Sequence, residues 1–215
     1  MQLYIGNQNY STWSLRAWLI FDNYNLNAEV IKLKLFTSDF YDTLAKVTPT
    51  AKVPTLVDGD VAVWDSLAIL EYVNDAHLNG AAWPSSVKER AHARVISAEM
   101  HSGFFAVRNE MPMNCRAQRK LKLSEDALKD IARIDAIWST QIEQYPEGWL
   151  FGEWSIADAM FAPVALRAET YGIQLSEKAS QYQQRVLNSP SIQKWLAEAS
   201  LETDVVEEDE AGDQV

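Results

Sequence analysis

The segment that most constrains the fold is "VPTLVDGDVAVWDSLAILEYV", which spans residues 53–73. Two short apolar runs flank Asp58-Gly59, a dipeptide favoured in tight hairpin turns because both central positions need a positive φ. A helix is expected to begin at Asp65 or Ser66, since both residue types cap helix N-termini and apolar residues at helical spacing follow. The segment therefore predicts two antiparallel strands that lead directly into a helix.

The residues before this hairpin predict two more strands and a helix between them. Residues 3–6, "LYIG", indicate a short buried strand, and residues 28–35, "AEVIKLKL", alternate as a second strand does. A helix is expected from about Ser14 to Asn23, with apolar side chains at Leu15, Trp18, Leu19 and Phe21. A short helix is also expected within residues 36–52, so the predicted order is β-α-β-(α)-β-β-α in residues 1–80.

The composition changes after Gly80, and from there to about Leu201 the pattern is helical. Residues 79–86, "NGAAWPSS", indicate a linker that ends at a helix N-cap, Ser85 or Ser86. Further helices are expected over residues 125–145, 155–172 and 189–200. The first helix after the linker carries a stripe of small and apolar residues that predicts its buried face: Val87, Ala91, Val95, Ala98, Ser102 and Phe105. We therefore expect an α/β domain over residues 1–80 and an all-helical domain over residues 86–201.

Much of the formal charge of −11 lies at the C-terminus. Residues 202–215 carry seven carboxylates and no cation, and without them the formal charge is −4. We expect this acidic segment to be a solvated, disordered tail, with an interaction role as the less favoured alternative. The rest of the chain has no basic stripe, which argues against a nucleic-acid partner.

The single cysteine, Cys115, excludes an internal disulfide and a cysteine-based metal cluster. The three histidines show no metal-ligand spacing, so no metal is expected. No apolar run approaches the roughly 20 residues that span a bilayer, and the N-terminus lacks the pattern of a secretory signal. These features predict a cytoplasmic protein without a membrane partner.

The order of the elements, a thioredoxin-like α/β domain followed by an all-α domain, resembles that of the glutathione S-transferase superfamily. The resemblance covers residues 1 to about 200 and is strongest to bacterial serine-type members of the theta and zeta kind. Its first motif is "KVPTL", and it implies a cis peptide bond before Pro54 and a Val53 backbone that pairs with glutathione. The alternative is a proline that simply opens an edge strand.

The second motif is "WDSLAILEYV", which matches the acidic-serine pair at the start of the third helix of the superfamily. A helix N-terminus presents free N–H groups and a partial positive charge, which suit a carboxylate. The Ser66 hydroxyl adds a donor, and the Asp65 carboxylate accepts from an ammonium group, so the pair suits the γ-glutamyl end of glutathione. The alternative is that these residues only cap their helix. A third motif, the capping box of Ser155 and Asp158, is interpreted as structural.

The loop after the first strand contains the candidate catalytic residue. Residues 11–14, "STWS", stand where thioredoxin-like proteins have C-x-x-C. Because this segment has no cysteine, disulfide chemistry is disfavoured, and the segment also differs from the usual zeta motif, which contains a cysteine. Ser11 best matches the serine that donates a hydrogen bond to the glutathione thiolate, and Tyr10 and Ser14 are the alternatives. Arg16 could orient this loop or pair with a carboxylate, and a surface position is equally compatible with the sequence.

The second-substrate pocket is expected on the helical domain. His101, Phe105 and Arg108 fall on the helix that lines this pocket in the superfamily, and Arg167 and Tyr171 fall on a later helix that approaches the same cleft. The alternative for each of these residues is packing inside a helix bundle.

The resemblance implies a cytoplasmic detoxification enzyme that conjugates the glutathione thiolate to a small hydrophobic electrophile. Glutathione is the co-substrate, no metal takes part, and the protein is expected to form a homodimer. Glutathione-dependent isomerisation and peroxide reduction are alternatives that use the same thiolate. A non-catalytic glutathione-binding or scaffold protein is the alternative from a different class.

Overall fold

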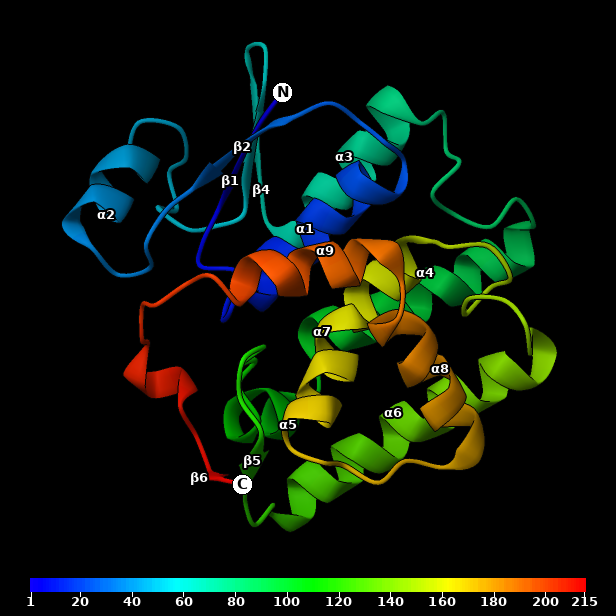
Figure 1. The fold of residues 1–215 in the computed structure, drawn as a ribbon. Helices are drawn as coiled ribbons and strands as arrows, with labels where there is room; N and C mark the ends of the chain where they lie inside the picture. Colours follow the sequence, from blue (N-terminus) through cyan, green and yellow to red (C-terminus); the bar gives the residue numbers. More distant parts are fainter.

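A four-stranded sheet with the order β2-β1-β3-β4 organises the N-terminal part of the computed structural model, which describes residues 1–215 (Figure 1). The central strand β1 pairs in parallel with β2 and antiparallel with β3, and β3 pairs antiparallel with β4. The strands are β1 (Gln2–Ile5), β2 (Glu29–Lys32), β3 (Thr55–Asp58) and β4 (Val61–Trp64). The predicted strands are therefore all present, within a mixed sheet.

The hairpin between β3 and β4 turns one residue later than the sequence predicts. Asp58 pairs with Val61, so Gly59 and Asp60 are the central residues of the turn. Gly59 has a φ of 61°, whereas Asp60 keeps a negative φ. Only one position of the turn therefore needs the left-handed region, and glycine occupies it.

Two helices cover one face of the sheet and a third covers the other. Helices α1 (Thr12–Asn23) and α3 (Ser66–His77) pack against each other on the side that faces the bundle. Helix α2 (Ser38–Leu44) lies on the opposite side, where Phe40 and Leu44 pack with Tyr4 and Leu33. The α1 and α3 helices therefore connect the sheet to the rest of the protein.

The second half of the chain is a bundle of helices in which α7 is central. All but one of the fifteen residues of α7 are buried, which explains why its sequence is apolar on every side. The bundle comprises α4 (Val87–Ser102), α5 (Phe105–Glu110), α6 (Glu125–Gln144), α7 (Ile156–Thr170), α8 (Glu177–Leu187) and α9 (Pro190–Ala199). None of the helices is both long and apolar enough to cross a membrane.

The sheet and the bundle share one hydrophobic core. A single cluster of 40 buried residues contains Leu3 and Ile5 of β1, Trp18 of α1 and Trp195 of α9. Trp18 and Trp195 are in direct contact, with ring centroids 5.3 Å apart. The connection between the two parts, residues 78–86, contributes Ala82 and Trp83 to this core, and Ser86 caps α4.

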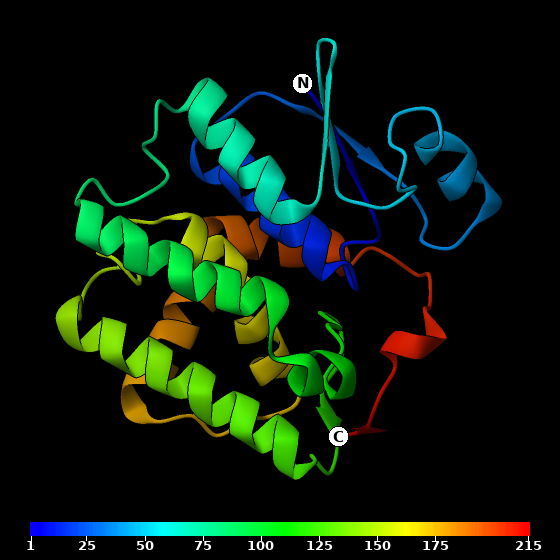
Figure 2. The same cartoon turned by 180° about the vertical axis from the view of Figure 1, so that it is seen from behind.

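The predicted buried stripe of α4 is wrong, because that face is exposed. Val87 and Val95 are 73% and 60% accessible, and Ala91, Ala98 and Ser102 are exposed as well. Figure 2 shows α4, in green, at the front of the bundle. The buried face carries Ala93, Ile96, Ser97 and Met100. These four residues have the same helical spacing, so periodicity alone does not decide which of the two faces meets the core.

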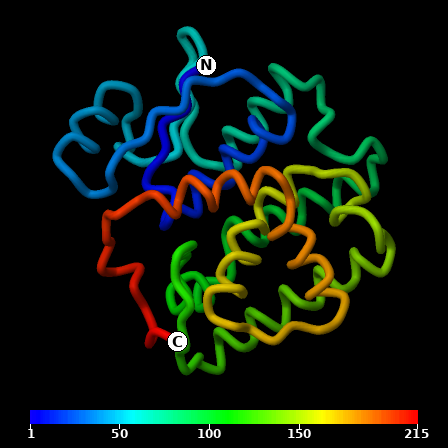
Figure 3. Tube along the Cα trace, viewed as in Figure 1, coloured from blue at the N-terminus to red at the C-terminus, as the bar shows by residue number.

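The acidic C-terminal segment is not a disordered tail in the structure. From α9 it runs past the N-terminal loop to the bundle, where β6 (Asp213–Gln214) pairs with β5 (Arg119–Lys120) (Figure 3). Its carboxylates bind groups far away in the sequence: Asp204 pairs with Lys34, and Glu210 pairs with Arg119. Composition predicts disorder only for a segment taken alone, and these partners are contributed by the rest of the fold.

Asp158 links the start of α7 to two other parts of the bundle. Its Oδ1 accepts hydrogen bonds from the Leu150 N–H (3.1 Å) and the Tyr182 hydroxyl (3.0 Å). Its Oδ2 accepts from the N–H (2.9 Å) and the hydroxyl (3.0 Å) of Ser155. Complete burial raises the pKa of this carboxyl to about 6, although the hydrogen bonds oppose the shift.

We expect Asp158→Ala to lower the free energy of unfolding by about 3 kcal/mol, because it leaves several buried donors without an acceptor. Urea unfolding followed by circular dichroism measures this change. The control is Asp42→Ala at an exposed position of α2, which we expect to stay within about 0.5 kcal/mol of the unchanged protein. Equal effects of the two substitutions would contradict the structural role of Asp158.

Candidate functional site

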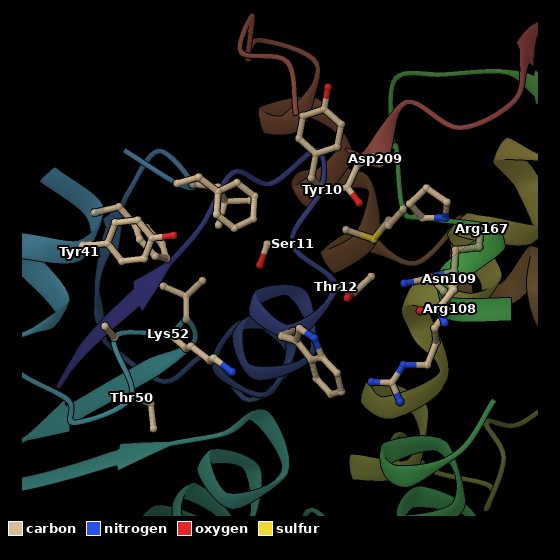
Figure 4. Close-up of a pocket in the computed structure, with 18 of the residues that line it drawn as sticks. Tyr10, Ser11, Thr12, Tyr41, Thr50, Lys52, Arg108, Asn109, Arg167 and Asp209 are labelled. Carbon is tan, nitrogen blue, oxygen red and sulfur yellow. The ribbon is translucent and has the colours of Figure 1, made fainter. Parts of the chain in front are cut away.

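Two adjoining cavities lie around the N-terminus of α1. The larger has a volume of about 670 Å³ and the smaller about 340 Å³. They share four lining residues: Trp13, Thr50, Lys52 and Val53. In the larger cavity, Tyr41, Thr50 and Lys52 lie on one side, and Arg108, Asn109 and Arg167 lie on the other (Figure 4). The cavity is thus built from both halves of the chain.

Ser11 is the N-cap of α1 and lines the larger cavity. Its Oγ donates to Ser14 Oγ at 2.7 Å and is 3.4 Å from the Ser14 N–H. Ser14 Oγ in turn accepts from the Gly6 N–H at 3.0 Å and is fully buried. Figure 4 shows Ser11 between the two sides of the cavity. Of the two serines, only Ser11 can meet a ligand, and Ser14 supports it from behind.

Tyr10 contributes its ring to the same cavity, but its hydroxyl is already bound. The hydroxyl donates to Glu210 at 2.6 Å and accepts from Arg116 Nη2 at 3.1 Å. It points away from Ser11 (Figure 4). Burial raises the pKa of the Tyr10 phenol, and the hydrogen bond to Glu210 raises it further. The contacts with the C-terminal segment therefore make Tyr10 the weaker candidate.

The smaller cavity contains the four residues that the sequence assigns to glutathione. The Val53–Pro54 peptide bond is cis, and Asp65 adopts a φ of 74° immediately before α3. Asp65 Oδ1 accepts two N–H groups from the first turn of that helix, at 2.9 and 3.2 Å. The Ser66 hydroxyl is buried and has no hydrogen-bond partner in the protein. The cavity therefore combines an unused hydroxyl, a carboxylate and a helix N-terminus.

His101 lines the smaller cavity and not the second-substrate pocket that the sequence predicts for it. Its Nε2 lies 3.2 Å from Asp65 Oδ2, and its ring meets Trp13 edge-on with centroids 5.6 Å apart. His101 thus brings the C-terminal end of α4 against the residues that precede α3.

The sequence analysis missed Trp13, although Trp13 lines both cavities. Its ring contacts two cations: the guanidinium carbons of Arg16 and Arg108 are 4.5 and 4.4 Å from a ring centroid. Arg16 is fully buried, and its Nε donates to the Met160 carbonyl at 2.9 Å. Burial lowers the pKa of Arg16, and the neighbouring arginines lower it further. Arg16 therefore joins α1 to the bundle and supports Trp13 from below.

The bundle side of the larger cavity is lined by Phe105, Arg108 and Arg167. The prediction for Tyr171 is wrong. Its hydroxyl donates to the Pro112 carbonyl at 3.1 Å, and its ring packs with Val107 and Met111 in a small core cluster. Tyr171 comes one helical turn after Arg167, but it lies at the C-cap of α7, where its side chain faces the core. Asn109 and Asp209 also line the cavity, and no sequence signal indicated either of them.

The acidic segment holds the loop that precedes Ser11. The two carboxylate oxygens of Glu202 accept the backbone N–H groups of Gln8 (2.7 Å) and Asn9 (3.0 Å). Asp204 accepts from the side-chain amide of Asn7 at 3.2 Å. Hydrogen bonds to a charged acceptor are stronger than those between neutral groups. The C-terminal segment therefore fixes the conformation of residues 7–9, which lead into the candidate catalytic residue.

We expect Glu202→Ala to loosen this loop, because the substitution removes both charge-assisted hydrogen bonds. Amide hydrogen exchange at Gln8 and Asn9 should become faster by about tenfold or more, as expected from a loss of roughly 1.5–3 kcal/mol. Glu208→Ala, at an exposed position of the same segment, should leave this exchange unchanged. Equal exchange in the two variants would show that the loop does not depend on Glu202.

Comparisons with known proteins agree with this architecture. A family profile described as "Glutathione S-transferase, N-terminal domain" matches residues 10–76. A probable maleylacetoacetate isomerase of Caenorhabditis elegans is 27% identical over 169 residues, which are 77% of each chain. Glutathione S-transferase Z2 of Arabidopsis thaliana is 39% identical over 67 residues, which are 31% of this chain and 30% of that protein. The crystal structure of a Burkholderia glutathione transferase homolog with bound glutathione has a TM-score of 0.72 at 24% identity, and it covers 93% of this chain and 97% of its own.

The fold is thus that of the glutathione transferases, with a thioredoxin-like N-terminal part and a helical C-terminal part. The family profile adds a match in sequence over the part that contains Ser11 and all the lining residues of the smaller cavity except His101. Residues 10–76 are thus similar in sequence to the N-terminal domain of the glutathione S-transferases, and the chain as a whole shares the fold of these proteins.

Proposed function

We propose that this protein binds glutathione in the smaller cavity and transfers its thiolate to an electrophile in the larger one. The observation that carries this proposal is the position of the Ser11 hydroxyl. It lies at the N-terminus of α1, on the wall of the larger cavity and two residues before Trp13, which lines both cavities. A sulfur held near Ser11 is therefore exposed to a substrate in the larger cavity.

The smaller cavity has the groups that a glutathione molecule requires. The backbone of Val53 pairs with the central cysteinyl residue of the tripeptide, next to the cis peptide bond. The Ser66 hydroxyl, which has no partner in the protein, donates to the γ-glutamyl carboxylate, and the positive end of the α3 dipole stabilises its charge. The Asp65 carboxylate faces the ammonium group. Lys52, which lines both cavities, is the nearest cation for the carboxylate of the glycine residue.

Ser11 acts by stabilising an anion and does not need to lose its proton. Without a ligand this proton is donated to Ser14 Oγ, so the Ser11 hydroxyl must rotate to donate to the sulfur, and the Ser14 hydroxyl then donates to Ser11 Oγ. A free thiol has a pKa of about 8.5, so only a small fraction is ionised at neutral pH. A hydrogen bond to a charged group contributes roughly 1.5–3 kcal/mol, and one pKa unit corresponds to about 1.4 kcal/mol. One hydrogen bond from Ser11 therefore lowers the thiol pKa by about one to two units, and the helix dipole acts in the same direction. The thiolate then attacks the electrophile and displaces a leaving group or adds to a double bond.

Glutathione-dependent isomerisation is the second candidate reaction. It is favoured by the match to a protein named as a probable maleylacetoacetate isomerase. In isomerisation the same thiolate adds to the substrate and is later released, so that glutathione is recovered unchanged. Mass spectrometry distinguishes the reactions, because transfer leaves a covalent conjugate. Binding of glutathione without turnover of any electrophile, peroxide or isomerisable alkene would instead indicate a non-catalytic binding protein.

We expect Ser11→Ala to raise the pKa of the bound glutathione thiol by about one to two units. Turnover at about pH 6.5 should then fall by about 10- to 100-fold, because a smaller fraction of the thiol is ionised. The ultraviolet absorbance of the thiolate, measured against pH in the complex, gives the pKa. The affinity for glutathione itself should change little, because the tripeptide is held mainly by the smaller cavity.

The control for this experiment is Ser11→Thr, which keeps both a hydroxyl and an N-cap. Because Ser11 caps α1, the alanine variant also loses about 1 kcal/mol of helix stability, and the threonine variant separates that effect from the chemistry. An unchanged thiol pKa in Ser11→Ala would exclude Ser11 as the group that stabilises the thiolate.

We further propose that a second copy of the chain covers the exposed face of α4. Small and apolar side chains follow the exposed face of this helix at intervals of three or four residues, and exposed apolar faces often mark protein–protein contacts. Small side chains also allow two helices to approach closely. A two-fold axis beside α4 would bring the same residues of both copies together, as symmetric dimers do.

We expect Val95→Glu to convert this dimer into a monomer of 24.3 kDa, because it places a carboxylate in the middle of the apolar face. Sedimentation equilibrium at several protein concentrations measures the mass. The control is Leu201→Glu, at a position that is 81% accessible and far along the chain from α4. A monomeric unchanged protein, or a dimer that survives Val95→Glu, would contradict the proposal.

A further inference from the structure

Two guanidinium groups on the bundle side of the larger cavity are held by hydrogen bonds to the backbone, but only some of their N–H donors take part in these bonds. Arg108 Nη1 donates to the carbonyls of Met100, His101 and Gly103, at 3.3, 2.9 and 3.2 Å. Arg167 Nη1 donates to three carbonyls between residues 107 and 111, at 3.3, 2.9 and 2.6 Å. The Nη2 and Nε atoms of both residues make no hydrogen bond to the protein. Each guanidinium is therefore held by one nitrogen and keeps its other donors free.

The charges around the cavity are unbalanced. Arg108, Arg167 and Lys52 line it, and the fully buried Arg16 lies directly behind Trp13. Burial lowers the pKa of both Arg108 and Arg167, and Arg108 lowers that of Arg167 further by repulsion. A group of like charges withdrawn from water is stabilised by an anion placed among them. The cavity thus favours a negatively charged ligand.

Asp209 is the single carboxylate on the wall of this cavity. Arg167 lowers the pKa of Asp209, but burial outweighs this effect and raises it to about 6. No ion pair closes between the two side chains, and the nearest ion pair of the segment is that of Glu210 with Arg119. Asp209 therefore interacts electrostatically with Arg167 without forming an ion pair, so the free donors of Arg167 remain available.

We propose that the electrophile of this protein carries a carboxylate, which binds the free N–H donors of Arg108 and Arg167. The planar fork of an arginine matches the two oxygens of a carboxylate, and here the forks are already oriented by backbone carbonyls. Apolar side chains such as Phe40, Phe105 and Met113 line the same cavity and receive the rest of the molecule. The substrate class is thus an apolar or aromatic electrophile with one anionic end.

This inference rests on the proposed function, because it assigns the larger cavity to the electrophile. Glutathione also carries carboxylates, but Arg108 and Arg167 do not line the smaller cavity. That cavity supplies its own donors from Ser66, Lys52 and the start of α3. The two arginines therefore remain for the second substrate.

The test compares two unreactive ligands of the same shape, 3-nitrobenzoate and 3-nitrobenzamide, by calorimetric titration of the full-length protein saturated with glutathione. The unchanged protein should bind the benzoate about tenfold more tightly or better, because a carboxylate gains charge-assisted hydrogen bonds that the amide lacks. Arg108→Gln should remove most of this preference and leave the affinity for the amide unchanged. Lys178→Gln, which removes one exposed positive charge on α8, is the matched control and should keep the preference.

Two further variants separate anion binding from folding. Arg167→Lys keeps a charge that can reach the backbone carbonyls but loses the fork, so it should lower the preference for the benzoate without unfolding the protein. Asp209→Asn removes the competing carboxylate and should increase the preference several-fold. A general destabilisation of the protein cannot explain both results, because Arg167→Lys lowers the preference for the benzoate and Asp209→Asn increases it.

Turnover is then compared for 4-chloro-3-nitrobenzoate and 4-chloro-3-nitrobenzamide, each relative to its uncatalysed reaction with glutathione. Conjugation of both compounds without preference for the carboxylate would overturn this inference while the transferase function stands. A second outcome is that the protein prefers the benzoate in binding, that Arg108→Gln abolishes this preference, and that neither chlorinated compound is turned over. This outcome would support the anion site and overturn the proposed function. Equal binding of the benzoate and the benzamide by the unchanged protein would exclude the anion site.

Discussion

The packing of α1 between the sheet and the bundle is the constraint on which the rest of the structure depends. Nine of the twelve residues of this helix are buried, including the cation of Arg16. Trp18 contacts α9, and Arg16 binds a carbonyl of α7, so both halves of the chain meet on one helix. The N-terminus of α1 carries Ser11, and its position relative to both cavities follows from this packing. A functional hydroxyl on a rigid, buried helix is held more precisely than one on a mobile loop.

The sequence alone predicts the elements whose signals are local. The strands, the hairpin and the long helices have periodic apolar residues or capping residues at their ends, and they appear where expected. Helices α5 and α8 were missed, because α5 has only six residues and α8 is mostly polar outside its buried face. The faces of α4 and the course of the C-terminal segment depend on partners distant in sequence, such as the contact of Glu202 with Gln8. No local pattern encodes those partners.

The candidate site was predictable to the same extent. Ser11, Val53, Asp65 and Ser66 belong to motifs at the ends of secondary structure elements, and the structure brings them to two adjoining cavities. The side chains predicted on the bundle helices were harder to assign from the sequence, because residues one helical turn apart can face either a cavity or the core. Tyr171 is such a case, since it packs in a small core cluster. A sequence signal for Trp13 was present, since it is the one aromatic residue among the hydroxyl-bearing residues Ser11, Thr12 and Ser14 at the start of α1. Its partners, a pair of arginines from different helices, become visible only in the folded chain.

The continuous core of the protein has a consequence for its thermodynamics. Because β1, α1, α7 and α9 bury their apolar side chains in one cluster, neither half of the chain covers its own hydrophobic surface. Separation of the halves would expose the apolar side of α1, including Leu15 and Trp18, to water. We therefore expect the two parts, which the sequence analysis separates into domains, to unfold together in one transition.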